Sequence, residues 1–420
     1  MNIIWVLYIL SYVRAGYSEH KRSKQVSGQK VLLISLDGFR WDFMSKNKNK
    51  IPNMIQMEQQ GVTAKYLLNV FPTNTFSNHY SVVTGLYPEN HGIIDNQMYD
   101  IKTNEKFSMK STNSKWWNKA EPIWITNQLN GHESGLCYWP GFNVKIKGAL
   151  PTYAPKMDKY ANPLTDFQSK HMPPTERIDL VLNWLSKPAV TFAAIYFEDL
   201  DSQLHDSGTE ISDNKFADID NTFAYLKKKL KSLSLEKKVN VIVVGDHGGK
   251  DVNHNKIIRL KDYFDIKQYI KTALGKTFVS IYPKPGQLQT VYNQLVHAHP
   301  NMTVYRKWEL PTYMHIKNSE LTAPLLLLAD PGWIIDTGFE TGVYFEGNEF
   351  YKGEHGYDVF HRDMNPGFFA FGPCFRKRKA IEKMETIDLY PIMCKIIRIT
   401  PHKNDASVEP MKKLLTKHCL

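Results

Sequence analysis

Seven oxygen- and nitrogen-bearing side chains, spread along the sequence, combine the ligand types of a zinc site with a hydroxyl nucleophile. The predicted set is Asp37, Thr75, Asp201, His205, Asp246, His247 and His355. Carboxylates and imidazoles suit zinc, which in catalytic sites keeps one position open for water or substrate. These groups divide naturally between two ions, and two metals about 4 Å apart can hold the attacking and leaving oxygens of a phosphoryl displacement. The residues therefore predict a centre of two Zn2+ ions that transfers phosphoryl groups.

Thr75 is the candidate nucleophile within this set. The segment 70–96 indicates a loop that delivers Thr75 to the first turn of a helix. A helix start offers unpaired backbone N–H groups and partial positive charge, so an anionic phosphoryl group fits directly over a hydroxyl there. A threonine hydroxyl is a poor nucleophile until a cation lowers its pKa, which the metal ions would do. The alternative is that Thr75 only caps the helix, a common role of threonine.

The elements that must position these groups follow an α/β pattern. Continuous apolar runs, typical of strands buried on both faces of a parallel sheet, span 30–36, 190–197 and 239–244. Helical patterns span 51–61, 123–131, 176–186 and 216–235. Each apolar run leads into predicted ligands, and ligands of open α/β sheets bind at the carboxyl ends of the strands. We expect a largely parallel central sheet with helices on both faces. Taken alone, Asp37-Gly38 is a common turn and His355 an ordinary loop histidine.

The length of 420 residues and the apolar fraction of 42% allow one large α/β domain or two smaller ones. The predicted organisation is a signal peptide over 1–15, a polar spacer over 16–29, a catalytic domain over 30–401 with a less regular insertion at about 287–350, and a tail over 402–420. The N-terminal apolar run is too short to span a membrane as a helix, although a short uncleaved anchor is the alternative. No apolar tail follows Pro401, so a soluble, secreted protein without a transmembrane anchor is expected.

The cysteines and the charge fit an extracellular protein. Cys137, Cys374, Cys394 and Cys419 have no zinc-finger spacing, so they are expected to be disulfide partners, with a pairing that the sequence does not reveal. Asn301 begins an N-glycosylation sequon. The net charge of +11 favours anionic partners such as nucleotides or acidic cell surfaces, and no stable nucleic-acid complex is expected.

Several separated motifs together point to a family. They are Leu36–Arg40, Phe71–Tyr80, Thr84–Ile93, Tyr138–Gly141, Asp246–Gly248 and Gly353–Asp358. In this order they resemble the motifs of the ectonucleotide pyrophosphatase/phosphodiesterases, which belong to the alkaline phosphatase superfamily. The resemblance runs from about Lys30 to about Pro401. It implies an alkaline phosphatase-like fold for the predicted catalytic domain.

The resemblance also assigns roles to individual residues. It implies one zinc set of Asp201, His205 and His355, and a second set of Asp37, Asp246 and His247, bridged by Thr75. Asn96 falls where the family has an amide that hydrogen-bonds a phosphate oxygen. Phe76 falls where the family has an aromatic ring against the nucleobase, and Tyr153 is a second candidate for that contact; a place in the core is the alternative for Phe76. The implied reaction forms a nucleotidyl-threonine, from which water releases a nucleoside 5′-monophosphate.

Some residues around the site depart from the family pattern. Asn74 stands where a lysine is common, Leu204 where a glycine is common and Gly249 where a methionine is frequent, and further departures are Ser77, Leu200 and Gly245. No predicted ligand is lost. We therefore expect a secreted nucleotide pyrophosphatase/phosphodiesterase acting on ATP, dinucleoside polyphosphates and related diesters. The alternatives are a choline-headgroup or lysophospholipid phosphodiesterase and a catalytically inactive nucleotide-binding protein.

Overall fold

The computed structural model describes residues 28–166, 169–339 and 351–420. The predicted signal peptide and most of the predicted spacer, together with residues 340–350 of the predicted insertion, lie outside these ranges. Three strands have the predicted bounds, and all their residues are buried: β1 (Lys30–Leu36), β6 (Val190–Phe197) and β7 (Val239–Val244). β1 lies between β6 and β7 and runs parallel to both. An unbroken apolar run matches this central position, where both faces of a strand are covered.

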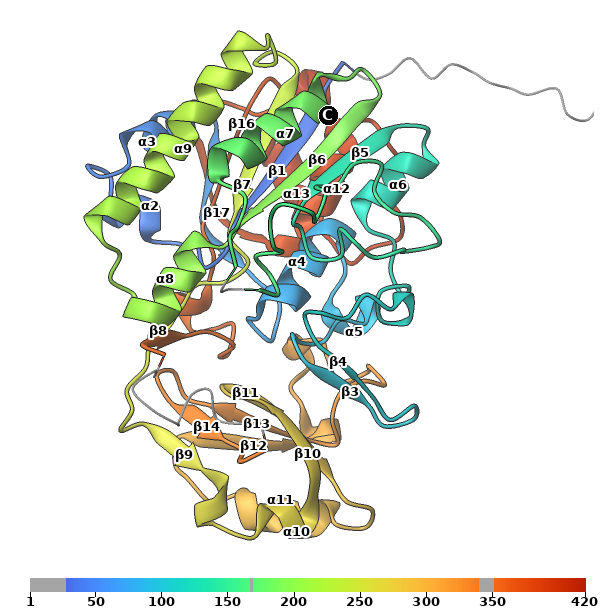
Figure 1. The fold of residues 1–420 in the computed structure, drawn as a ribbon, viewed down its shortest axis with the longest axis vertical. Coiled ribbons are helices and arrows are strands. Elements are labelled where there is room, and N and C mark those ends of the chain that lie inside the picture. The colour runs from blue at the N-terminus through green and yellow to red at the C-terminus, as the bar shows by residue number, and fades with distance from the viewer. Residues whose placement is uncertain (1–27, 167–168, 340–350) are drawn as a thin grey trace, which may run out of the picture.

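The central sheet has seven strands in the order β17-β2-β16-β7-β1-β6-β5 (Figure 1). The outer strands are β2 (Val62–Leu68), β5 (Glu133–Cys137), β16 (Phe368–Phe371) and β17 (Lys379–Glu385). β16 is antiparallel to both of its neighbours, whereas every other adjacent pair is parallel. The α/β class with a largely parallel sheet is confirmed.

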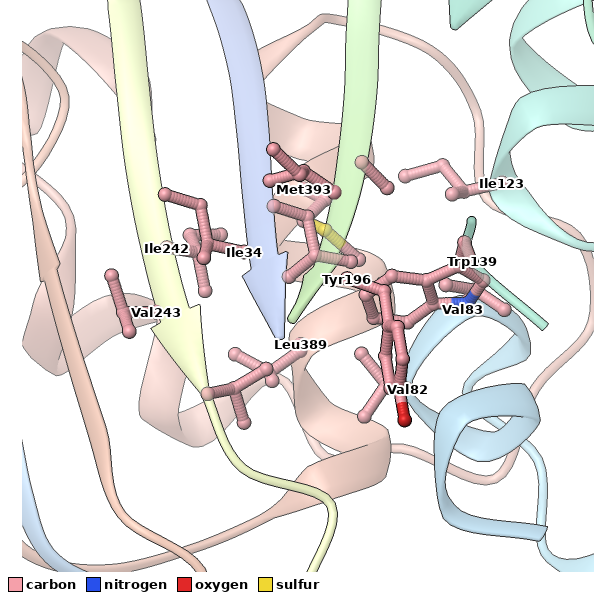
Figure 2. Packing of buried hydrophobic residues seen from close by; sticks show 14 of the residues in the cluster. Ile34, Val82, Val83, Ile123, Trp139, Tyr196, Ile242, Val243, Leu389 and Met393 are labelled. Carbon is pink, nitrogen blue, oxygen red and sulfur yellow. The ribbon is translucent and has the colours of Figure 1, made fainter. Parts of the chain in front are cut away.

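Helices cover both faces of this sheet. On one face lie α3 (Pro52–Gln59), α7 (Pro174–Ser186) and α9 (Asp213–Ser232), which pack on one another and on β6 and β16. On the other lie α4 (Thr75–Thr84), α6 (Ile123–Leu129) and α12 (Leu389–Ile396). Figure 2 shows Ile34 of β1, Val82 of α4 and Met393 of α12 among the side chains of one buried cluster. The apolar stripe of α9 faces the core, while Lys228 and Lys231 are exposed.

A second, smaller sheet lies beside the carboxyl ends of the central strands (Figure 1). It is antiparallel, with the order β10-β11-β13-β12, formed by β10 (Ile270–Gly275), β11 (Phe278–Pro283), β12 (Met302–Arg306) and β13 (Leu325–Ala329). Val279 and Leu327 belong to a hydrophobic cluster of its own, which α11 (Leu288–Leu295) helps to cover. The described part of the predicted insertion thus contains strands of a regular sheet, and this sheet begins before position 287. The predicted domain boundaries themselves stay a prediction.

The four cysteines divide into one disulfide and two thiols. Cys374 and Cys419 are bonded, and this bond ties the C-terminal tail to the segment after β16. The expectation of disulfide bonding is wrong for Cys137 and Cys394, which are free and buried in the apolar core at β5 and α12. Within the described ranges, the helices are all too short or too polar to cross a membrane.

Candidate metal centre and active site

The seven predicted residues converge at the carboxyl edge of the central sheet. Asp37 directly follows β1, and Asp246 follows β7 after one glycine. His247 directly follows Asp246, and the other ligand positions are on α8 (Asp199–Ser207) after β6 and directly after the short strand β15 (Gly353–Glu354). Because parallel strands end at one edge, residues distant in sequence meet there. Thr75, at the start of α4, faces the same cluster.

The first ligand set is held by α8 and the loop after β15. Asp201 and His205 are four residues apart on α8 and therefore share one face of the helix. The His205 Nε2 atom lies 3.3 Å from Asp201 Oδ2, and the His355 Nε2 atom lies 3.7 Å from Asp201 Oδ1. One ligand atom from each of these residues lies within 4.8 Å of the other two, which is close enough for a shared ion.

The second ligand set surrounds His247. Its Nε2 atom lies 3.2 Å from Asp37 Oδ1 and 3.2 Å from Asp246 Oδ2. The His247 ring stacks on the His355 ring with 3.6 Å between their centroids, so the two sets are neighbours. Asp201 also reaches the group of Asp37 and His247. The structure thus brings together both sets that the family resemblance implied.

All three predicted histidine ligands are oriented in the same way. The Nδ1 atoms of His205, His247 and His355 lie 2.9, 2.8 and 3.0 Å from the carbonyl oxygens of Gly353, Gly248 and Thr73. A carbonyl only accepts hydrogen bonds, so Nδ1 carries a ring proton and Nε2 is the ring atom that faces the carboxylates. Metal-ligating histidines adopt the same orientation, with the other ring nitrogen donating to an acceptor.

Asp37 and Asp246 are buried and Asp201 is partly buried, and each has a buried carboxylate oxygen without a partner. Asp37 Oδ1, Asp201 Oδ1 and Asp246 Oδ2 make no hydrogen bond to any described residue. Burial, together with the Asp246 carboxylate, raises the pKa of Asp37 well above its usual range, and burial raises the pKa of Asp246 to about 7. Burial also acts to raise the pKa of Asp201, but His205 and His355 outweigh it and hold that pKa below its ordinary value. Concentrated carboxylate charge with free oxygen lone pairs is the environment that a cation would stabilise, so this donor set fits divalent metal ions.

Thr75 does not cap α4. Asn74 occupies the cap position, and its side chain donates to Asp95 Oδ1 at 2.6 Å instead of bonding the helix. Thr75 is the first helical residue, is 5% exposed, and places Oγ1 3.4 Å from His247 Nε2. The capping alternative therefore does not account for Thr75, whose hydroxyl faces the ligand cluster.

The three residues predicted to contact the substrate, Asn96, Phe76 and Tyr153, do not all lie at the ligand cluster. Asn96 lies beside the nucleophile, where its Oδ1 atom accepts from Phe76 N at 2.8 Å. Phe76 is 2% exposed and packs on Phe107 and Trp117, as the core alternative expects, so a nucleobase contact by its ring stays a prediction. Tyr153 is not brought to the site, because it bridges to Gly135 in β5 and stacks on Trp184 at the end of α7, away from the carboxyl ends of the strands. We therefore do not propose Tyr153 as a substrate contact.

This geometry agrees with the similarity of the chain to known proteins. A family model described as "Type I phosphodiesterase / nucleotide pyrophosphatase" matches residues 31–358, which include all seven predicted residues. The chain belongs to this family. Ectonucleotide pyrophosphatase/phosphodiesterase family member 5 of Homo sapiens is 38% identical over 416 residues, covering 97% of this chain and 82% of the relative. A bis(5′-adenosyl)-triphosphatase of Xenopus laevis is 36% identical over 394 residues, covering 93% of this chain and 82% of the relative.

A solved structure shares the fold. Murine family member 5, as an inactive variant with alanine in place of a threonine and in complex with AMP, superposes with a TM-score of 0.84 at 36% identity. The match covers 92% of this chain and 100% of that chain. The chain therefore has the fold of the phosphodiesterase family over nearly all of its length, consistent with the predicted alkaline phosphatase-like architecture.

The sequence did not identify the side chains that hydrogen-bond the predicted site residues from outside the ligand cluster. The Nδ1 atom of His79 lies 2.8 Å from the Thr75 carbonyl oxygen, and its Nε2 atom lies 2.7 Å from Ser35 Oγ. Burial lowers the pKa of His79 to about 3, so this ring is neutral. Tyr196 on β6 donates its hydroxyl to Asp37 Oδ2 at 2.5 Å. A tyrosine within an apolar strand carries no sequence signal for this contact. The Asn78-His79 pair, four residues or fewer after the nucleophile, was a usable signal for His79.

Replacing Tyr196 with phenylalanine is expected to lower the affinity of the site for divalent metal by about tenfold or more, because outer partners of metal ligands contribute effects of that size. Burial raises the pKa of Tyr196, so its hydroxyl stays protonated and orients Asp37. Competition with a chromophoric chelator measures the affinity. Tyr138→Phe is the matched control, since the buried Tyr138 hydroxyl has no partner in the described chain. Equal affinities of the two variants would contradict the role of Tyr196.

Proposed function

We propose that this chain is a zinc-dependent nucleotide pyrophosphatase/phosphodiesterase that converts extracellular nucleotides and nucleotide diesters to nucleoside 5′-monophosphates. The observation that carries the proposal is the shared orientation of the three histidines, each of which turns Nε2 toward carboxylate oxygens in the cluster with Thr75. The similarity to a bis(5′-adenosyl)-triphosphatase supports dinucleoside polyphosphates as substrates. ATP and related diesters present the same phosphoryl chemistry.

Two sets of residues would hold the zinc ions. Asp201, His205 and His355 would bind one, and Asp37, Asp246 and His247 the other, with Thr75 between them. When bound, the ions supply positive charge that lowers the pKa of the Thr75 hydroxyl and offsets the charge of the phosphate. The buried carboxylate oxygens without partners support this assignment, as do the two groups of ligand atoms that lie within 4.8 Å of one another.

The chain's own residues would then carry the two displacements. The Thr75 oxygen, having lost its proton to solvent, bonds to the phosphorus of the nucleotidyl group, and the bond from phosphorus to the leaving phosphate or alcohol breaks. A water molecule next attacks the same phosphorus, breaks its bond to Thr75 and releases the 5′-monophosphate, and the hydroxyl regains a proton. The Asn96 oxygen is held by Phe76 N, so its NH₂ group is the part that would donate to a phosphate oxygen. The start of α4 adds a favourable dipole for that anion.

Secretion is part of the proposal. The predicted signal peptide supports it, as does the sequon at Asn301, which is partly exposed before β12 and donates to Asp330. The disulfide between Cys374 and Cys419 is typical of oxidising compartments. The positive net charge of +11 supports association with acidic cell surfaces.

The experiment that tests the function is product analysis on diadenosine triphosphate and ATP. The purified protein is expected to release AMP from both, to lose this activity after treatment with a zinc chelator, and to regain it when zinc but not magnesium is added, because the donor set mixes imidazole with carboxylate. Chromatography of the nucleotides gives the measurement. Glycerophosphocholine in a parallel reaction is the control substrate. Choline release that exceeds AMP release, or AMP binding without turnover in the zinc-loaded protein, would overturn the proposal.

A further inference from the structure

A single apolar side chain touches all three chain segments that carry the histidine ligands. Leu204 directly precedes His205 on α8 and is 6% exposed. A β-carbon built on Gly249 would lie 2.2 Å from Leu204 Cδ2, and one built on Gly353 would lie 2.4 Å from Leu204 Cδ1. Both distances are far below van der Waals contact, so the leucine occupies the space that side chains at these two positions would need. Leu204 therefore packs directly on the backbone of both loops.

The two glycines lie next to the peptide groups that orient the ligands. Gly353 is two residues before His355, and its carbonyl oxygen accepts from His205 Nδ1. Gly249 is two residues after His247, and the carbonyl of the adjacent Gly248 accepts from His247 Nδ1. The same two loops are joined by the antiparallel pair of β8 (Lys250–Asp251) and β15. The position of these carbonyl oxygens sets the direction in which each Nε2 atom points.

We propose that Leu204 is a positioning residue of the metal centre: by filling the space over Gly249 and Gly353, it holds the two carbonyls that aim His205 and His247. The inference rests on the proposed metal site. A large side chain at position 204 leaves no room for one at position 249 or 353.

A cavity behind the leucine makes this support sensitive to truncation. The cavity has a volume of about 500 Å³ and is lined by Leu204 and Gly249 together with Gly38 and Leu200. A smaller residue at 204 would extend this existing space and remove the contact with Gly249 and Gly353. The loops would then lose the contact that fixes their distance from α8.

The test measures zinc affinity by competition with a chromophoric chelator, alongside circular dichroism melting of the metal-free protein. Leu204→Ala and Leu204→Gly are expected to lower zinc affinity by about tenfold or more. The control Leu230→Ala removes a comparably buried leucine from α9 and is expected to lower the melting temperature without changing zinc affinity. The double variant Leu204→Gly with Gly249→Met is expected to recover most of the lost affinity, since it returns volume to the same space.

The outcomes separate this inference from the proposed function. If Leu204→Ala bound zinc as tightly as the wild-type protein, the positioning role would be overturned and the metal site would stand. A double variant that bound zinc no better than Leu204→Gly would have the same consequence. If Leu230→Ala lowered zinc affinity as much as Leu204→Ala does, the positioning role would also be overturned, because the effect would then reflect the general stability of the fold. A wild-type protein that binds no zinc would overturn the proposed function and this inference with it.

Discussion

An alanine at position 75 will lower the turnover of nucleotide diesters by at least about 10³-fold, a loss of roughly 4 kcal/mol of transition-state stabilisation. The reason is that Thr75 Oγ1, 3.4 Å from His247 Nε2, is the hydroxyl that faces the ligand cluster from the start of α4. The six carboxylate and histidine ligands are untouched by Thr75→Ala, so binding of zinc and of AMP should persist. Steady-state kinetics and equilibrium AMP binding on the same preparation measure both quantities.

Thr75→Ser supplies the matched control for this experiment. Serine keeps the oxygen and removes only a methyl group, so it should retain far more activity than alanine. Murine family member 5 was obtained in complex with AMP as an inactive variant with alanine in place of a threonine. An alanine variant with turnover close to that of the serine variant would show that Thr75 is not the nucleophile.

Asp201→Asn is expected to cost at least about 100-fold in activity and to release metal, since even partners outside the ligand shell contribute up to that amount. Its two oxygens face His205 and His355, and it also reaches the group of Asp37 and His247. Asparagine keeps the shape and removes the charge. Metal content by elemental analysis after dialysis, together with diester hydrolysis, gives the measurement.

Asp199→Asn is the control on the same helix. Asp199 lies two positions earlier on α8 and pairs with Lys215 at 2.8 Å, so its carboxylate is engaged away from the cluster. This variant should keep both metal and activity. If Asp201→Asn held as much metal as Asp199→Asn, Asp201 would be a structural carboxylate and the first ligand set would be wrong.

The strands and the convergence of their ends were accessible from sequence for a physical reason. Runs such as 190–197 can bury every side chain only in the middle of a covered sheet, and parallel strands necessarily place their carboxyl ends at one edge. Asp37 and Asp246 were therefore predictable as neighbours although they are far apart in the chain. The positions of helices such as α7 followed from the same alternation.

Contacts that depend on tertiary packing could not be predicted from the sequence. Tyr153 has the ring needed to stack on a base, but only its bridge to Gly135 shows that it lies away from the site. Tyr196 looks like any other member of an apolar strand until its neighbour β1 brings Asp37 to its hydroxyl. Cys137 and Cys394 fit a secreted composition, yet both are enclosed in the core without a bonded partner. In each case the deciding contact comes from another element of the chain.

The orientation of the histidine ligands has a consequence for how this site withstands mutation. Their Nδ1 atoms are held by carbonyl oxygens of Gly353, Gly248 and Thr73, which belong to the main chain and exist whatever residue stands there. If carboxylate side chains oriented the histidines, a single substitution would remove an acceptor. Here the acceptors are main-chain carbonyls, which stay in place as long as the backbone of the loops is unchanged. Evolutionary drift around such a site is restricted in backbone path, and at Gly248 and Gly353 in side-chain size as well, because a β-carbon there would lie 2.0 Å from the Asp363 carbonyl oxygen and 2.4 Å from Leu204 Cδ1.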